Sequence, residues 1–197
     1  ALVATLASSA RADGETRPAC GDLNGDGSSE IVVGFAPYPS DGGKFAIFDG
    51  ATPTLLEFRT LDWTNYNAVN GELWPACGDV DADGKDEICL GQGHYKTVGG
   101  WVRYYDDRAA SYAPMSWLHV DWSAYNSAVG EVRPSIGNLD SDPGMETVIG
   151  FGPYPADGGK VAIYQDSAAL FALLRWQTVP LAAYNAVNGE TRPSARR

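Results

Sequence analysis

Oxygen-bearing side chains recur at fixed spacing in three short loops of the sequence. A hard divalent cation takes about six to eight oxygen ligands, and alternate residues of a tight loop can face one centre. The side chains at positions one, three, five and nine, with a backbone carbonyl at position seven, would supply such a shell. The ligand sets are Asp22, Asn24, Asp26, Ser28 and Glu30; Asp79, Asp81, Asp83, Lys85 and Glu87; and Asn138, Asp140, Asp142, Gly144 and Glu146.

The loops favour calcium over other ions. Magnesium prefers a small octahedral shell and sheds water reluctantly, so a flexible carboxylate loop suits it less. An EF-hand is excluded, because the place of its position-twelve glutamate is held by Val33, Leu90 and Ile149. The alternative is an Asx-rich hairpin turn without metal, which three aligned copies disfavour. The sequence therefore predicts about three Ca²⁺ ions, one in each loop.

The three loops are not expected to bind equally. The second has four ligand acids and Gly84 at position six, where glycine permits a sharp bend. The third has Asn138 in place of an acid and the rigid Pro143 at position six. We expect the second loop to bind most tightly and the third to release its ion first.

The loops belong to an internal repeat. The motif Gly-Glu-x-x-Pro begins at positions 14, 71, 130 and 189, at intervals of 57, 59 and 59 residues. This divides the chain into three repeats, with the last strand of a preceding repeat before them and the start of a further one after them. The predicted ranges are 1–13, 14–70, 71–129, 130–188 and 189–197.

Each repeat has the pattern of about four short strands. The acidic loop leads into an apolar run such as Ile31-Val32-Val33, then a glycine-rich turn, then an alternating segment such as Lys44 to Phe48. Short β-branched and aromatic runs bounded by Gly, Pro and Asp are typical of strands. The fold expected is all-β, with three tandem four-stranded repeats of the β-propeller-blade type.

The acidic composition narrows the classes of binding partner that the chain could have. The net charge of −11 and the pI near 4.4 argue against nucleic acid or an anionic membrane surface as a partner. No stretch approaches the ~18 apolar residues of a membrane span. Three cysteines, Cys20, Cys77 and Cys89, are interpreted as buried apolar thiols, with a Cys77–Cys89 disulfide as the alternative.

The run Gly21-Asp-Leu-Asn-Gly-Asp-Gly27, continued by Glu30-Ile-Val-Val-Gly34, resembles the FG-GAP/VCBS repeat family, which includes the blades of the integrin α-subunit propeller. The resemblance covers residues 14–188 and is weakest in the third copy. It implies a β-propeller with calcium between the first two strands of each blade. It also implies an extracellular or cell-surface setting and roles in adhesion, recognition or scaffolding.

Two classes of function are carried forward. The first is a non-catalytic, calcium-stabilised structural or assembly module, which associates with itself or with further repeats because three blades do not close a propeller. The second is a carbohydrate- or protein-binding propeller that uses the recurrent loop tyrosines Tyr38, Tyr95 and Tyr154. The alternative for these tyrosines is that they pack against the neighbouring blade. An enzyme is disfavoured, since His94 and His119 do not recur and the suitable acids lie in the metal loops.

Overall fold

The computed structural model describes residues 14–38, 41–96 and 98–195. The prediction for residues 1–13 therefore lies outside the described residues, as do the last two residues of segment 189–197. In the described part the strands are β1 (Thr16–Gly21), β2 (Glu30–Phe35), β3 (Lys44–Phe48), β4 (Leu55–Thr60), β5 (Leu73–Gly78), β6 (Glu87–Gln92), β7 (Trp101–Tyr105), β8 (Pro114–His119), β9 (Val132–Gly137), β10 (Glu146–Phe151), β11 (Lys160–Tyr164) and β12 (Leu173–Thr178).

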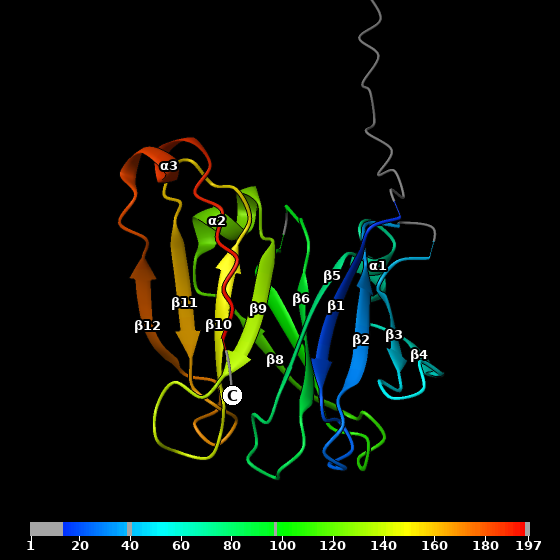
Figure 1. The fold of residues 1–197 in the computed structure, drawn as a ribbon. Coiled ribbons are helices and arrows are strands. Elements are labelled where there is room, and N and C mark those ends of the chain that lie inside the picture. The colour runs from blue at the N-terminus through cyan, green and yellow to red at the C-terminus, as the bar shows by residue number, and fades with distance from the viewer. Residues whose placement is uncertain (1–13, 39–40, 97, 196–197) are drawn as a thin grey trace, which may run out of the picture.

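These strands form three four-stranded antiparallel sheets with simple meander order, β1 to β4, β5 to β8 and β9 to β12. We call them blades 1, 2 and 3. The blades stand side by side, with the first strand of each blade at the middle of the assembly and β4 and β12 at its outer sides (Figure 1). The first strands also contact one another, β1 with β5 and β5 with β9. The predicted all-β fold of three four-stranded repeats is confirmed.

The hydrophobic core lies between neighbouring blades as well as within them. One cluster joins residues of blades 1 and 2, including Leu61 and Leu90, and another joins blades 2 and 3, including Val120 and Ile149. Close approach needs glycine at the contact: a Cβ on Gly34 would lie 2.5 Å from the carbonyl oxygen of Leu73. Each blade therefore buries its apolar face against the next, as expected of a repeat that cannot bury its own core.

A short helix follows the last strand of each blade: α1 (Thr64–Asn67), α2 (Ser123–Ala128) and α3 (Ala182–Val187). Each contains the recurrent Tyr-Asn pair. The hydroxyl of Tyr66 donates to the carbonyl of Glu72 at 2.5 Å and accepts from the amide of Gly93 at 2.8 Å. The helices lie at one end of the blades and the acidic loops at the other (Figure 1).

The cysteines are free thiols. In the β5–β6 ladder Ala76 is paired with Cys89 and Cys77 with Ile88, so the two thiols point to opposite faces of the sheet and the disulfide is ruled out. The prediction of a buried thiol is wrong for Cys20, which is exposed. Cys77, the same position in blade 2, packs on the preceding blade, where a Cβ on Gly21 would lie 2.4 Å from it.

None of the helices among the described residues is long and apolar enough to cross a membrane.

Candidate metal sites

Each acidic loop connects the first two strands of a blade. The first ligand position follows the glycine that ends one strand, and the position-nine glutamate begins the next. In the ladders these two residues are register partners, Gly21 with Glu30, Gly78 with Glu87 and Gly137 with Glu146. The antiparallel pairing therefore holds both ends of the predicted ligand set at the edge of a rigid sheet.

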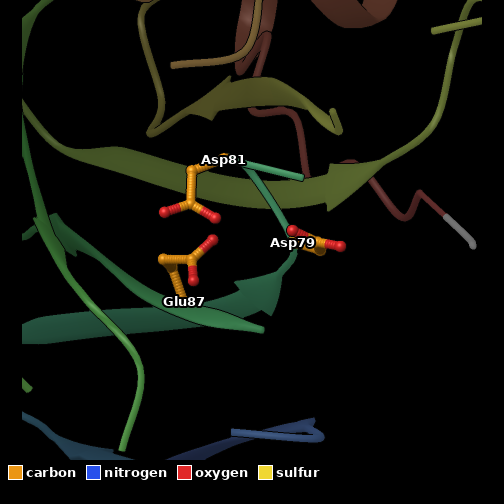
Figure 2. A group of neighbouring side chains, drawn as sticks. All are labelled: Asp79, Asp81 and Glu87. Atoms are coloured by element: carbon orange, nitrogen blue, oxygen red, sulfur yellow. The ribbon is translucent and has the colours of Figure 1, made fainter. Parts of the chain in front are cut away.

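The loop of blade 2 brings three carboxylates together. Oxygen atoms of Asp79, Asp81 and Glu87 all lie within 4.8 Å of one another. The carboxylates of Asp81 and Glu87 face each other, with Asp79 beside them (Figure 2). Two backbone donors support the cluster: the amide of Val80 donates to Glu87 Oε2 at 2.8 Å, and that of Gly84 to Asp79 Oδ2 at 3.1 Å.

The environment of Glu87 favours a bound cation. Its side chain is fully buried, and its Oε1 has no hydrogen-bond partner. Burial, followed by the negative charges of Asp81, Asp79 and Asp83, raises the pKa of Glu87 to about 9. A buried carboxylate among like charges is costly without a counter-ion. The donor set of blade 2 therefore fits a divalent metal ion.

The remaining two predicted ligands of this loop lie apart from the cluster. Lys85 Nζ binds Asp83 Oδ2 at 2.5 Å and Asp107 Oδ2 at 2.6 Å. These hydrogen bonds raise the pKa of Lys85, so its ammonium stays charged. Asp83 is thereby turned toward Lys85, and at position seven the backbone carbonyl is the group left to face an ion.

Blade 3 gathers a second cluster of three carboxylates. Oxygen atoms of Asp140, Asp142 and Glu146 lie within 4.8 Å of one another. The amide of Leu139 donates to Glu146 Oε2 at 2.6 Å, while Oε1 of this fully buried glutamate has no hydrogen-bond partner. Burial raises the pKa of Glu146, and Asp140 and Asp142 add to the effect. This donor set also fits a divalent cation.

The loop of blade 3 differs from the other two loops at positions one and six, where it has Asn138 and Pro143. Asn138 donates its amide to the carbonyl of Asp142 at 2.7 Å, in place of an acid that would accept. Pro143 has no N–H to donate to position one and cannot take a positive φ. Gly84, its counterpart in blade 2, has φ 92° and donates to Asp79.

In blade 1 the side-chain oxygens of the loop accept hydrogen bonds from other groups of the same loop. Asp22 Oδ1 accepts from the amide of Gly25 at 2.8 Å, and Asp22 Oδ2 accepts from that of Gly27 at 2.8 Å. Asn24 donates its side-chain amide to Glu30 Oε1 at 2.7 Å, the oxygen that is unpartnered in the other two glutamates. Asp26 Oδ1 accepts from the amide of Ser28. The same five residues line the loop, but their carboxylates are not drawn into one cluster.

Sequence reasoning missed two buried aspartates beside position seven. Asp107 binds Lys85, and a Cβ on Gly144 would lie 2.1 Å from Asp166 Oδ2, so only glycine fits there. Both aspartates also accept a backbone amide three residues later, from Ala110 and from Ala169. The repeat alignment places them at the same offset after the third strand of blades 2 and 3, and this signal could have found them.

The metal loops of blades 1 and 2 are also held by the following blade. The carbonyl of Asp22 accepts from the amide of Asp86 at 2.9 Å, and that of Asp79 accepts from Met145 at 2.9 Å. The next carbonyl in the second loop, that of Val80, accepts from Ser167 at 2.9 Å. The loops are therefore parts of the junctions between blades, and their shape affects how the blades dock.

The predicted ligand-binding tyrosines have different surroundings. Tyr95 and Tyr154 pack edge-on against tryptophans of the preceding blade, with ring centroids 5.7 Å from Trp63 and 5.5 Å from Trp122. Tyr38 is exposed and lines a cavity on blade 1. Two of the three are thus placed by packing between blades.

No protein-family model matches the chain. A curated relative, integrin alpha-4 of Xenopus laevis, is 27% identical over 143 residues, which are 69% of this chain and 14% of the relative. The chain thus spans about one seventh of that protein's length. This match agrees with the resemblance of the repeats to those of integrin α-subunits.

Among solved structures, the rhamnogalacturonan lyase PL11 of Bacillus licheniformis aligns with a TM-score of 0.58 at 16% identity, covering 86% of this chain and 35% of the lyase. The exotype rhamnogalacturonan lyase YesX aligns with a TM-score of 0.57 at 14% identity, covering 88% of this chain and 34% of the lyase. At these identities the likeness concerns the fold.

Proposed function

We propose that this chain is a non-catalytic, calcium-binding β-repeat module with a structural and assembly role outside the cell or at its surface. The observation that carries the proposal is the fully buried position-nine glutamate of blades 2 and 3, each with an oxygen that lacks a partner beside two further carboxylates. A bound Ca²⁺ supplies the positive charge that these oxygens lack.

In blade 2 the ion would be held by Asp79, Asp81 and Glu87, and in blade 3 by Asp140, Asp142 and Glu146. The first loop would hold an ion with Asp22, Asn24, Asp26 and Glu30 after a rearrangement of its internal hydrogen bonds. An extracellular setting suits this chemistry, because extracellular calcium modules work with dissociation constants of about 10⁻⁴–10⁻³ M. The match to an integrin α-subunit supports the same setting.

The structural role follows from where the loops lie. Because the following blade donates hydrogen bonds to loop carbonyls, as Met145 does to Asp79, a collapsed loop would disturb the blade junction. The side chain of His119 supports a non-catalytic interpretation, because its ring stacks on Trp101 with centroids 4.2 Å apart.

Thermal unfolding with and without chelator tests the proposal. A metal that binds only the folded state stabilises it by about 2.7 kcal/mol per site at 100-fold excess over Kd, so three sites would give roughly 8 kcal/mol. We expect chelation to lower the melting temperature by on the order of twenty degrees, and calcium to restore it better than magnesium. Equal melting with and without chelator would show that the loops are only turns.

A second candidate function, carbohydrate binding, is favoured by an aromatic pocket. Asp62, Trp63, Trp101 and Trp117 line a shallow pocket of about 440 Å³ at the junction of blades 1 and 2. Aromatic faces with one polar group are typical of small-ligand sites. On a glycan array, Trp101→Ala should abolish binding while Tyr38→Ala retains it. Binding lost with Tyr38→Ala or Tyr154→Ala would assign it to the loop tyrosines, and no binding by the wild type would remove the candidate.

A further inference from the structure

The two junctions inside the chain share one construction. A tryptophan that follows the last strand of a blade inserts into an aromatic socket of the next blade. Trp63 lies 5.5 Å from Trp117 and 5.7 Å from Tyr95, and Trp122 lies 5.6 Å from Trp176 between ring centroids. We call this residue the plug and the pocket that receives it the socket.

Blade 1 carries a socket that the described residues leave open. Its cavity of about 520 Å³ is lined by Phe35, Tyr38, Lys44 and Phe58, among others. Three of these align with Phe151, Tyr154 and Trp176, the residues that surround the plug in blade 3. Lys44 aligns with Lys160, whose ammonium lies 4.8 Å from the centroid of the Trp122 ring.

Blade 3 carries the complementary exposed plug. Leu181 stands at the plug position and is 55% exposed. Tyr184 of α3 is 39% exposed, and Leu139, in the metal loop at the other end of the blade, is 42% exposed. Their counterparts in blade 2, Tyr125 and Val80, are fully buried by blade 3. The open face of blade 3 is thus the same face that is buried at both internal junctions.

The occupant of this face is indicated by a sequence that the chain carries twice. Residues 189–193 and residues 14–18 are both Gly-Glu-Thr-Arg-Pro. The first of these segments already lies on blade 3, where the amide of Thr191 donates to the carbonyl of Phe151 at 2.9 Å. Its hydroxyl accepts from the amide of Phe151 at 2.9 Å and donates to the carbonyl of Lys160 at 2.7 Å.

The threonine makes this recognition specific. At the same place in the motif, blades 2 and 3 have Leu73 and Val132, which have no hydroxyl. Thr16 of blade 1 is the matching residue. Glu190, which binds Arg133, likewise corresponds to Glu15, whose side chain is 53% exposed.

We propose that blade 3 binds blade 1 of a second copy of this chain, with residues 14–18 of the incoming copy replacing the identical segment 189–193. Leu181 then enters the socket of Phe35, Tyr38 and Phe58. Copies join head to tail, and two copies supply six blades, which lies in the range of about four to eight found in closed propellers. This inference rests on the proposed assembly role but not on the identity of the metal.

Sedimentation velocity on the full chain in calcium tests the pairing, with two variants that each remove one face. Leu181→Asp removes the plug and Phe58→Asp removes the socket. Both residues are exposed, so the circular dichroism spectrum of each variant should match that of the wild type. We expect the wild type to associate, each variant alone to be monomeric, and an equimolar mixture to form dimers through the one intact pair of faces. Leu170→Asp is the matched control, because Leu170 is 87% exposed and lies outside both faces, and it should associate as the wild type does.

Replacement of the segment is tested by two threonine variants with opposite effects. Thr191→Val weakens the resident segment and should tighten association, whereas Thr16→Val weakens the incoming segment and should loosen it. Each change should be roughly ten-fold in dissociation constant, the effect of about one buried hydrogen bond.

A wild type that stays monomeric, or a mixture of the two face variants that stays monomeric, would overturn the proposal. Melting of the same samples with chelator reports separately on the metal, so a failure of assembly and a failure of the calcium proposal are distinguishable.

Discussion

Blade 2 and blade 3 have the same strands, the same kind of loop and the same connecting helix, but their surroundings differ. Blade 2 is covered on both sides, so Val80, Val120 and Tyr125 are fully buried. Their counterparts in blade 3, Leu139, Val179 and Tyr184, are exposed. A residue's burial in this molecule is therefore set by the neighbouring blade more than by its own.

The difference extends to the metal loops. The carbonyls of Asp79 and Val80 accept hydrogen bonds from Met145 and Ser167 of blade 3. Among the described residues, no backbone hydrogen bond of this kind is made to the carbonyls of the third loop. The comparison teaches that the next blade holds the backbone of a metal loop, whereas the carboxylates of the third loop come together without that support. Each of the following predictions tests one part of the difference between the two blades.

The largest difference in unfolding free energy between the two blades is expected on substitution of the residue at position one of each metal loop. Asp79→Ala removes a carboxylate that accepts from Gly84 in the middle loop, whereas Asn138→Ala removes an amide that donates. In excess calcium we expect Asp79→Ala to cost about 3 kcal/mol of unfolding free energy, the linkage of one site, and Asn138→Ala less than about 1 kcal/mol. Calorimetry gives both values. In chelator the gap should shrink, and equal losses in calcium would break the distinction between the loops.

The pH dependence of the unfolding free energy should differ between a glutamate at the junction of blades 1 and 2 and the matching glutamate on the open side of blade 3. Burial raises the pKa of Glu72 to about 7, with Glu131 and Glu15 adding to the effect of burial and Arg17 opposing it. For Glu190, burial raises the pKa, but the hydrogen bonds from Arg192 and Arg133 outweigh it and the pKa is lowered. The two glutamates occupy the same place in the Gly-Glu motif, so their shifts in opposite directions report on their surroundings.

The signs of the two effects are opposite. Between pH 4.5 and about 7 the folded state holds a proton on Glu72 that the unfolded state has lost, so stability falls as pH rises through this window. The lowered pKa of Glu190 gives stability that is present at neutral pH and lost in acid. With calcium held in excess, Glu72→Gln should flatten the decline from pH 5 to pH 7.5 by up to about 3 kcal/mol. Glu190→Gln should instead lower stability at neutral pH. A decline unchanged in Glu72→Gln would refute this assignment.

Truncation of a valine that contacts neither metal nor charge should show how much packing by the next blade contributes to stability. Val120→Ala leaves a cavity between blades 2 and 3 and should cost about 2 kcal/mol. Val179→Ala, the matched variant on the open face, should cost less than about 0.5 kcal/mol in dilute solution. Urea unfolding measures both. A Val179→Ala cost that grows with protein concentration would show that a second copy covers this face.

The repeat made most of the fold predictable. The Gly-Glu-x-x-Pro spacing, the β-branched runs and the acidic loops each mark a place in a blade, and the structure has a sheet for each repeat. Contacts between blades were not predictable, because nothing local in the sequence reports them. The exposure of Cys20 and the choice of Trp63 as the ring that Tyr95 packs against both depend on which residue of another segment lies opposite.

The smallest expected effect concerns the backbone of the third loop. Pro143 fixes φ near −65° and has no N–H, whereas Gly84 has φ 92° and donates to Asp79. Pro143→Gly alone should change calcium affinity little, because Asn138 offers no carboxylate to receive the new donor.

The double variant Asn138→Asp/Pro143→Gly restores both partners. It should bind calcium about ten-fold more tightly at the third loop, a gain of about 1.4 kcal/mol. The metal-free protein should lose up to about 1 kcal/mol, since glycine adds entropy to the unfolded chain. Titration calorimetry and chelator melting should therefore move in opposite directions. If the double variant gains no affinity, the weakness of the third loop lies in its open face and not in its sequence, and covering that face with a second copy becomes the way to strengthen it.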